Sequence, residues 1–530
     1  MPRPEQEEPV VFDLVEDGAD GAQDDGSDGP GADEAGAGRA LRLPRLPRLS
    51  RRGWLRVGAA VLAVAVTLTA VDLLREQRRA ELMAGSPVGV VSLSSPPEET
   101  WSLPYDRSGA SVAPGLDQQV VVMDGLLVLP PATVYDAVAQ DGGGPGEGPP
   151  GFDGVVAVDP ASGEIAWRVP VGEEATCAPA GYDATLTTDV LTCVHGPAGE
   201  REIVAIGADG AARTRPADEG ENETVFPGPD GSVVRARRTG PPPRKAVCEE
   251  TGVCTPREVS DGRDVRVVLE DATTGTERWR ADVAFTPVDA IACAEHGDGP
   301  EATVDADRVS VTTSARSVVL EGCGVYATFA LEGARIDQVD ALGDVWSWVQ
   351  ELGPGRFAVG SASGRGAVVD EEGDVVTELD GSVKPAPASP DAPGVLWFVD
   401  DPAGNGFDAV RADGTVVWSE RYGTRVLLTT RDAVVVERGP EIVGLDPASG
   451  AELWTWRDDE PQHRSPFRAV TDGETVAVAF WPQELPGTGE LVALDVRAGT
   501  ERWRTGLDGT VVAVGGRLVE VSDGGLHGLG

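Results

Sequence analysis

A short hairpin motif recurs four times in this 530-residue chain with a constant internal spacing. Each copy has an apolar run, an Asp, a Gly four residues later and a Trp four residues after the Gly. The copies are Asp159-Gly163-Trp167, Asp271-Gly275-Trp279, Asp446-Gly450-Trp454 and Asp495-Gly499-Trp503. A motif repeated along one chain predicts a repeat architecture, in which the recurring residues serve the scaffold.

Each part of one copy has a structural reason. The apolar, β-branched run before the Asp is typical of a strand that is buried on both faces. The Asp side chain can accept hydrogen bonds from backbone N–H groups in a tight turn, and Gly tolerates a positive φ there. A Trp at a regular place on the following strand suits packing between sheets. Each copy therefore predicts a β-hairpin whose Trp fills the space between two sheets.

Weaker copies lie between the strong ones and keep the order strand, turn, strand. They surround Gly210, Gly333, Asp370-Gly373 and Asp413-Gly414-Trp418. Successive copies are roughly 35 to 65 residues apart, which brackets the length of a four-stranded propeller blade. Two β-sandwiches are the alternative, but sandwiches do not repeat a motif at this length. The sequence predicts an all-β fold, a β-propeller of about eight four-stranded blades with roughly seven to nine possible, over residues 95–530.

The two ends of the predicted propeller complement each other. After Trp503 the chain has three short strand-like runs and stops, one strand short of a four-stranded blade. The segment around Trp101 (ETWSLPYD) is similar to the outer strand that carries Trp454. We expect it to complete the last blade, because this removes an exposed sheet edge. With this blade included, the candidate blades number one more than the eight predicted. We therefore expect one of the weak copies to be an insertion rather than a blade.

The Asp-x-x-x-Gly-x-x-x-Trp hairpin resembles the repeat of pyrroloquinoline-quinone-like (PQQ-like) propellers. That group holds quinoprotein dehydrogenases, the outer-membrane assembly scaffold lipoprotein of Gram-negative bacteria, and many membrane-tethered bacterial proteins. The resemblance covers roughly residues 95–530, with four specific copies. It implies the fold, whereas function does not follow from a fold.

For a quinoprotein dehydrogenase, the resemblance implies adjacent cysteines over the cofactor, a carboxylate base and calcium ligands. The sequence has no Cys-Cys pair. The repeated aspartates are assigned to turns, because an active site normally occurs once. The acidic run 370–374 is a solvated turn rather than a calcium loop, which needs about six placed oxygens. The chain's histidines pair with no Ser or Cys in a recognisable motif: His195, His296, His463 and His527.

We therefore predict that the protein is not an enzyme and has no catalytic, cofactor-binding or metal-binding residues. The predicted function is a binding or scaffold module for a protein or a cell-envelope polymer. The alternative is a PQQ- or metal-dependent oxidoreductase with a divergent active site. A net charge of −44 argues against nucleic acid as a partner, because phosphates repel such a surface.

The cysteines indicate an oxidising compartment. All of them lie in the predicted propeller, and an even number in such a compartment predicts disulfides. Sequence neighbours are the simplest pairs, and zinc is the alternative, although no paired C-x-x-C spacing supports it. The expected pairs are Cys177–Cys193, Cys248–Cys254 and Cys293–Cys323.

The first part of the chain predicts where the propeller lies. Residues 1–38 are acidic and Gly/Ala-rich, so we expect them to be disordered, and arginines then dominate up to residue 53. Residues 54–74 approach the roughly 20 apolar residues of a membrane-spanning helix. Residues 75–94 are assigned as a linker.

The charges around residues 54–74 predict the topology. Arginines cluster before this segment, which orients the amino terminus to the cytoplasm and the propeller to the outside. A cleaved signal peptide is the alternative, but its charged region would not normally follow about fifty other residues. The sequence thus predicts a single-pass cell-membrane protein with a cytoplasmic tail at residues 1–53 and an extracytoplasmic propeller.

Overall fold

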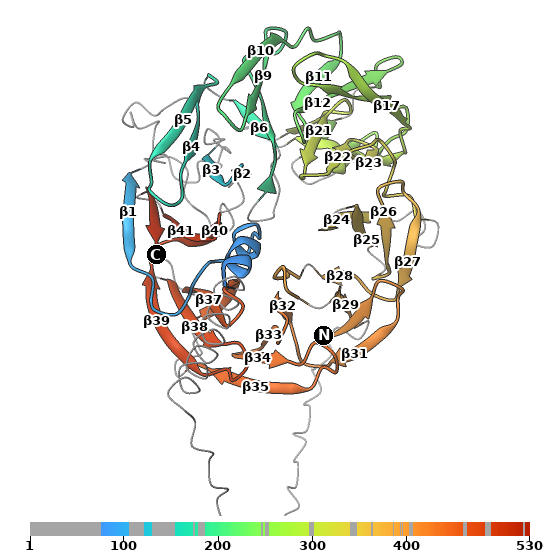
Figure 1. Cartoon of the computed structure of the whole chain (residues 1–530). Coiled ribbons are helices and arrows are strands. Elements are labelled where there is room, and N and C mark those ends of the chain that lie inside the picture. Colours follow the sequence, from blue (N-terminus) through green and yellow to red (C-terminus); the bar gives the residue numbers. More distant parts are fainter. Residues whose placement is uncertain are drawn as a thin grey trace, which may run out of the picture. The chain divides into compact units, whose positions relative to one another are not determined.

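A computed structural model describes the chain from residue 76 onward, with gaps (Figure 1). Contacts divide the chain into residues 1–69 and 70–530, and every described residue belongs to the second unit. The predicted tail (1–53) and membrane span (54–74) lie outside the described residues. Within the described part, no helix has the length and apolar character needed to cross a membrane. The described residues are 76–104, 121–129, 154–172, 175–178, 186–244, 247–249, 254–295, 301–339, 347–353, 355–361, 364–384, 386–392, 394, 396–401, 406–458, 464–482, 489–522 and 525–530.

The described chain is almost entirely β-structure. Nine of its sheets are antiparallel meanders, which we number sheets 1 to 9 along the chain. Sheet 1 contains β2 (Val121–Met123), β3 (Leu126–Leu129), β4 (Gly154–Val158) and β5 (Ile165–Pro170), with β7 (Leu186–Thr187) added parallel to β2. Sheet 2 contains β6 (Thr176–Ala178), β8 (Val190–His195), β9 (Glu202–Gly207) and β10 (Ala212–Pro216). Sheet 3 contains β11 (Glu223–Pro227), β12 (Ser232–Thr239), β16 (Asp264–Asp271) and β17 (Glu277–Val283).

Sheets 4 to 6 continue in the same order. Sheet 4 contains β21 (Val309–Thr313), β22 (Ser317–Gly322) and β23 (Val325–Ala330). Sheet 5 contains β24 (Ser347–Gly353), β25 (Arg356–Ser361), β26 (Gly366–Asp370) and β27 (Val375–Leu379). Sheet 6 contains β28 (Val383–Lys384), β29 (Leu396–Asp400), β30 (Phe407–Arg411) and β31 (Val416–Glu420).

Sheets 7 to 9 complete the series. Sheet 7 contains β32 (Arg425–Thr429), β33 (Val434–Arg438), β34 (Glu441–Leu445) and β35 (Glu452–Arg457). Sheet 8 contains β36 (Arg464–Thr471), β37 (Thr475–Pro482), β38 (Gly489–Asp495) and β39 (Glu501–Leu507). Sheet 9 contains β40 (Thr510–Val514), β41 (Arg517–Ser522), β42 (Gly525–Leu529) and β1 (Glu99–Pro104).

Sheet 9 is built from both ends of the described chain. Strand β1 pairs antiparallel with β42, and Trp101 lies opposite Gly528. Backbone N–H groups of Glu98 and Gly530 each donate to the other residue's carbonyl at 3.0 Å. The prediction that the segment around Trp101 completes the last sheet is confirmed. The weak copies around Gly210, Asp370 and Asp413 form strands of sheets 2, 5 and 6, whereas the copy around Gly333 contributes β23 to the three-stranded sheet 4 and no fourth strand among the described residues.

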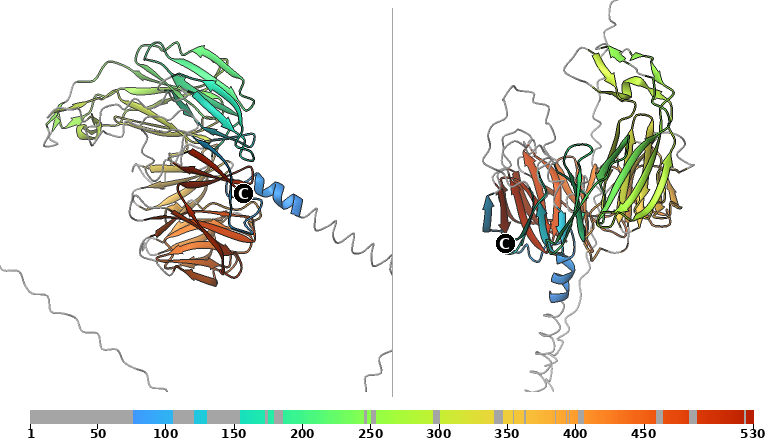
Figure 2. Two further views of the ribbon diagram at one scale, coloured as in Figure 1. Left: turned by 90° about the vertical axis from the view of Figure 1, so that its left-hand side faces the viewer. Right: turned by 90° about the horizontal axis from the view of Figure 1, so that it is seen from above.

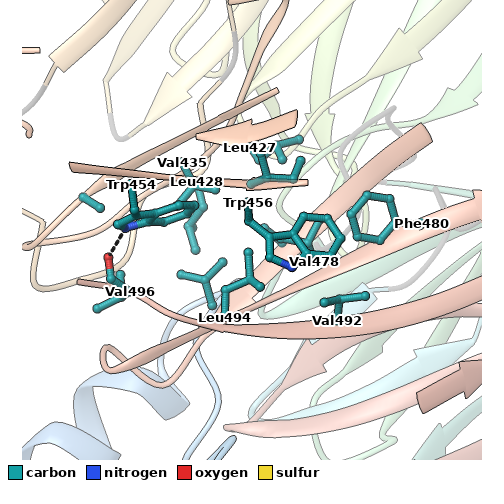
Figure 3. Packing of buried hydrophobic residues seen from close by; sticks show 14 of the residues in the cluster. Leu427, Leu428, Val435, Trp454, Trp456, Val478, Phe480, Val492, Leu494 and Val496 are labelled. Atoms are coloured by element: carbon teal, nitrogen blue, oxygen red, sulfur yellow. Dashed lines mark hydrogen bonds between the residues drawn. The ribbon is translucent and has the colours of Figure 1, made fainter. Parts of the chain in front are cut away.

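The core lies between neighbouring sheets. Middle strands such as β4 are buried along their whole length, as their apolar sequences predict. Between sheets 7 and 8, Leu428 and Trp454 pack with Val478 and Leu494 (Figure 3). Each interface of this kind buries apolar surface that one sheet alone would leave in water.

The meander order gives every sheet two distinct ends. Connections from the first to the second strand and from the third to the fourth lie at one end, which we call the turn end. All Asp-x-x-x-Gly turns are third-to-fourth connections and lie there. The second-to-third connections and the links to the next sheet lie at the other end, which we call the link end.

The inserted segments of sheets 3 and 4 leave from the link end. They form two small sheets: β13 (Val247–Glu249), β14 (Cys254–Thr255), β19 (Ala294–Glu295) and β20 (Glu301–Val304) make one, and β15 (Glu258–Val259) with β18 (Val288–Asp289) makes the other. A 3₁₀ helix, η2 (Ala290–Cys293), precedes β19. We call residues 240–263 and 284–308 the inserted module.

Residues 76–93 lie against sheets 8 and 9 and form the N-terminal strap. The strap begins with a helix at residues 76–84, which projects from the sheets in both views of Figure 2. Its extended part pairs in parallel with the first-to-second-strand connections, through the N–H of Val90 to the Thr471 carbonyl at 2.9 Å and the N–H of Val91 to the Gly516 carbonyl at 2.8 Å. The strap therefore lies at the turn end of these two sheets.

Candidate functional site

The repeated aspartates cap their own turns. In the Asp446 turn, Oδ1 accepts the N–H groups of Ala448 and Ser449 at 3.1 and 2.8 Å. The Asp495 turn is the same, with Arg497 and Ala498 as donors at 2.9 Å each. Corresponding bonds occur at Asp159 and Asp271. The aspartates thus have the turn role that the sequence suggested.

The glycines and tryptophans of the motif join neighbouring sheets. Gly499 has φ +64° and lies flat under the indole of Trp454, whose Nε1 donates to the Val496 carbonyl at 2.9 Å (Figure 3). A Cβ on Gly499 would lie 2.5 Å from this ring. The same indole-to-carbonyl contact recurs from Trp101 to Pro160, Trp167 to Ala208, Trp279 to Leu331 and Trp418 to Pro447, at 2.9 to 3.1 Å.

Trp503 makes this contact with the strap. Its Nε1 donates to the Leu93 carbonyl at 2.8 Å. In sheet 9 the fourth strand is β1, so no turn connects the third strand to the fourth. Trp503 therefore has no backbone carbonyl of an Asp-x-x-x-Gly turn to bond in sheet 9. Leu93 supplies the missing acceptor, and its own N–H donates to Asp472 Oδ2 at 2.8 Å. The strap therefore takes the place of a turn in the closing sheet.

An arginine replaces the tryptophan in sheet 2. Arg215 Nε donates to the Ala272 carbonyl at 2.7 Å, the place that an indole N–H occupies elsewhere. Its guanidinium also pairs with Glu270, which Arg235 Nε contacts at 2.9 Å. The sequence hypothesis treated this copy only as degenerate. Arg215 lies five residues after Gly210, whereas the motif Trp follows its Gly by four, so the repeat spacing does not point to this residue.

The cysteines form the expected pairs. The structure joins Cys177 to Cys193, Cys248 to Cys254 and Cys293 to Cys323. The last two hold the inserted module, one within it and one between η2 and the β22–β23 turn of sheet 4. The sulfur atoms are thus used in bonds to each other and none is a zinc ligand.

A buried arginine also fastens the inserted module. Arg238, at the end of β12, donates to the backbone carbonyls of Arg263, Arg308 and Cys323 at 2.6, 2.9 and 3.0 Å. Burial lowers the pKa of this guanidinium. Next to it, Arg263 pairs with Asp307 at 2.6 Å. Arg238 thus connects the described part of the module to sheets 3 and 4.

A chain of polar contacts crosses the closing sheet. His527 on β42 places Nδ1 3.1 Å from Glu99 Oε2 on β1, and Nε2 3.4 Å from Ser522 Oγ on β41. No sequence motif indicates this contact, because it depends on the register of the β41–β42 hairpin. The order of serine, histidine and carboxylate is that of a hydrolytic triad.

Other contacts of these groups favour a structural role. The Ser522 hydroxyl also donates to the Gly525 carbonyl at 3.3 Å within its own hairpin. The nearby N–H groups of Asp508 and Gly509 donate to Glu520 at 2.5 and 2.8 Å, so they are not free to stabilise an oxyanion. The contacts of His527 instead connect β1 to β42 and β41 across the junction of the chain ends.

The described ranges contain no candidate metal-binding site. No group of three or more His, Cys, Asp or Glu side chains there could hold an ion. In the acidic run 370–374, Asp370 Oδ1 accepts the N–H of Asp374 at 2.8 Å, as in a turn. His195 contacts Glu202 at 3.4 Å, whereas His296 and His463 lie outside the described residues.

Glu520 gives a pH-dependent prediction. Burial raises the pKa of its carboxyl, although the N–H bonds from Gly509 and Asp508 act the other way. The pKa of Glu520 in the folded protein therefore exceeds its unfolded value of about 4.3. Folding then takes up protons at this carboxyl, so the contribution of Glu520 to stability falls as pH rises from about 4.3 through the folded pKa. Glu520→Gln keeps an acceptor oxygen for both bonds. We expect its urea midpoint to fall less than that of the wild type as pH rises from about 4 to about 7.

The control for this prediction has the opposite sign. The hydrogen bond from Arg504 lowers the pKa of Glu501, so its contribution exists above the unfolded pKa and disappears as pH falls through the folded value. Glu501→Gln should therefore lose stability relative to the wild type at neutral pH and less in acid. An identical pH profile for wild type and Glu520→Gln would contradict the prediction.

The geometry of the C-terminal sheets agrees with a family comparison. Residues 438–529 match a family model described as outer membrane protein assembly factor BamB, of the PQQ-like repeat type. Residues 438–529 carry PQQ-like propeller repeats. The matched segment contains the copies at Asp446 and Asp495, so the resemblance expected from these hairpins is confirmed. A search of curated proteins finds no match.

Solved structures also align with the repeats. BamB from Moraxella catarrhalis aligns at 16% identity with a TM-score of 0.34, covering 68% of this chain and 95% of that chain. The computationally designed Ika8 protein aligns at 12% identity and 0.30, covering 68% and 96%. Kluyvelomyces marxianus Hsv2 aligns at 13% identity and 0.27, covering 60% and 94%. These alignments are too loose to define the fold, which the sheet order defines directly.

Proposed function

We propose that the chain is a single-pass membrane protein whose extracytoplasmic propeller is a non-catalytic scaffold for a protein or envelope-polymer partner. The main support is the match of residues 438–529 to a family named for an assembly factor. In addition, the repeated side chains cap turns and join sheets, as described above. We also propose nine blades, the upper end of the expected range, because sheets 1 to 9 each contribute one meander.

The proposed location rests on two independent features. Three disulfides suit an oxidising compartment outside the cytoplasm. The Arg-rich residues before 54–74 favour a cytoplasmic amino terminus.

The anchoring is tested with the full chain and with residues 76–530 expressed in the same cells. We expect the full chain to stay in the membrane pellet after alkaline carbonate extraction and the shorter chain to be released. An impermeant protease added to intact cells stripped of their wall should digest the propeller of the full chain and leave the tail. Release of the full chain by carbonate would contradict anchoring.

The scaffold role is tested by photo-cross-linking. A photoreactive amino acid at exposed positions around the propeller, such as Tyr422 and Val247, should yield discrete adducts in intact cells. The oxidoreductase alternative is tested by titrating residues 76–530 with pyrroloquinoline quinone and calcium. Saturable absorbance changes with a rise in melting temperature would overturn the non-catalytic proposal.

A further inference from the structure

The outer strand of sheet 5 exposes two adjacent apolar side chains, whereas the outer strands β31 and β35 each expose one, Val416 and Leu453. β27 begins with Val375 and Val376, whose side chains are 44% and 37% exposed. In sheets 3 and 8 the corresponding residues are charged and pair locally. Arg278 contacts Asp271 at 3.4 Å, and Arg502 contacts Asp495 at 2.6 Å. Charged outer strands of this kind resist pairing with another chain, and β27 lacks this protection.

The backbone of β27 is also available along one edge. β27 is the last strand of sheet 5 and pairs only with β26. Thr377 stands where sheets 1, 3, 6, 7 and 8 carry the Trp, so this position has no indole N–H to bond a carbonyl of the next sheet. Neither Lys nor Pro interrupts Val375–Leu379, and both commonly block sheet edges. The next outer strand along the rim, β31, exposes Val416 but is held by Trp418 (Figure 1).

The segment that contains β27 is acidic. Residues 370–380 contain six acidic and no basic side chains. Arginines of neighbouring segments compensate three of these carboxylates: Arg316 contacts Glu371 at 2.6 Å, Arg356 contacts Asp370 at 3.9 Å and Arg365 contacts Glu378 at 4.0 Å. Glu372, Asp374 and Asp380 form no ion pair within the described part of the chain. The surface thus combines a free strand edge, two exposed valines and uncompensated carboxylates. Its complement is an extended segment with apolar and basic side chains in alternation.

We propose that β27 is a docking edge that accepts an extended, alternating apolar and basic segment of a partner protein as a fifth strand of sheet 5. Main-chain hydrogen bonds to β27 supply affinity, Val375 and Val376 contact the apolar side chains, and the carboxylates of Glu372, Asp374 and Asp380 select basic ones. This inference rests on the proposed scaffold function and specifies the chemistry of its partner.

The test uses synthetic peptides of about nine residues and the full chain in detergent. The probe alternates lysine and valine, and a second peptide alternates glutamate and valine. Two further versions of the lysine peptide carry methyl groups on every second backbone nitrogen, one on the odd-numbered and one on the even-numbered residues. Fluorescence polarisation measures binding to the wild type, to Val375→Lys/Val376→Lys and to Val416→Lys, which places the same charge on the neighbouring outer strand.

We expect the lysine peptide to bind the wild type and Val416→Lys, and to lose affinity at least about tenfold with the β27 variant. The glutamate peptide and one of the methylated peptides should also bind at least about tenfold more weakly. If neither methylated peptide binds more weakly than the unmethylated one, main-chain hydrogen bonds do not contribute to binding. The contact would then be charge attraction alone, and the proposal that the peptide adds as a strand would be wrong. Equal binding to all variants, or no binding, would overturn the proposal. If discrete cross-links still form elsewhere on the propeller, the scaffold function survives that failure.

Discussion

Deleting the N-terminal strap is expected to lower the free energy of unfolding of the propeller by about 5 kcal/mol. Met83, Val90 and Leu93 are each at most 2% exposed, and burying one such side chain contributes about 1.5 to 3 kcal/mol. The deletion also leaves the indole N–H of Trp503 and the carboxylate of Asp472 without their strap partners. A buried polar group that loses its partner adds to the cost.

The measurement compares residues 76–530 with residues 98–530 by urea unfolding. The shorter chain keeps β1, so only the strap differs. Gln77→Ala in the longer chain is the control, because the exposed Gln77 side chain bonds to Glu81 at 3.0 Å within its own helix, so the change should stay within about 0.5 kcal/mol of the wild type. Equal unfolding midpoints for the two chains would show that residues 76–97 are a linker and not part of the closure.

Replacing Trp454 by alanine is expected to cost about 4 kcal/mol. The side chain is 7% exposed and packs between sheets 7 and 8 with Leu428 and Leu494 (Figure 3). Alanine leaves a cavity there and removes the hydrogen bond to the Val496 carbonyl. We expect a large loss of stability because the Trp454 indole connects sheet 7 to sheet 8, so its removal weakens the packing between the two sheets.

Two further variants separate the contributions of Trp454. Trp454→Phe keeps an aromatic ring and loses the N–H, so we expect a smaller loss, of which the hydrogen bond accounts for about 1 kcal/mol. Tyr422→Ala changes an aromatic side chain that is 74% exposed and should stay within about 0.5 kcal/mol of the wild type. A loss for Trp454→Ala no greater than that for Tyr422→Ala would exclude the indole as a joint between sheets.

The local unit of this fold could be predicted because its causes are local. A turn of Asp-x-x-x-Gly forms from the geometry of its own residues, and the bonds to Asp446 and Asp495 span at most three positions. The repeat then predicts the hairpins, and the missing strand of the last sheet points to the segment around Trp101. The disulfide pairs were likewise the simplest neighbours along the chain.

The candidate docking edge could not be found in the same way. In the sequence, 370–380 is one of several acidic turns, and its valines look like those of buried strands. Only the sheet order places β27 at an edge, and only burial distinguishes Val375 from the valines of β26. The Arg215 substitution and the contacts of His527 also depend on which strands become neighbours.

By itself the sequence determined the repeat, the turn chemistry of its aspartates and glycines, and the pairing of the chain ends in one sheet. Tertiary structure decided how the sheets are joined: Trp503 bonds to Leu93, more than 400 positions earlier, in place of a turn. A residue's own conformational preferences act over a few positions, so a sequence pattern records them directly. Contacts between sheets depend on the positions of all the intervening strands, and no short pattern contains that information.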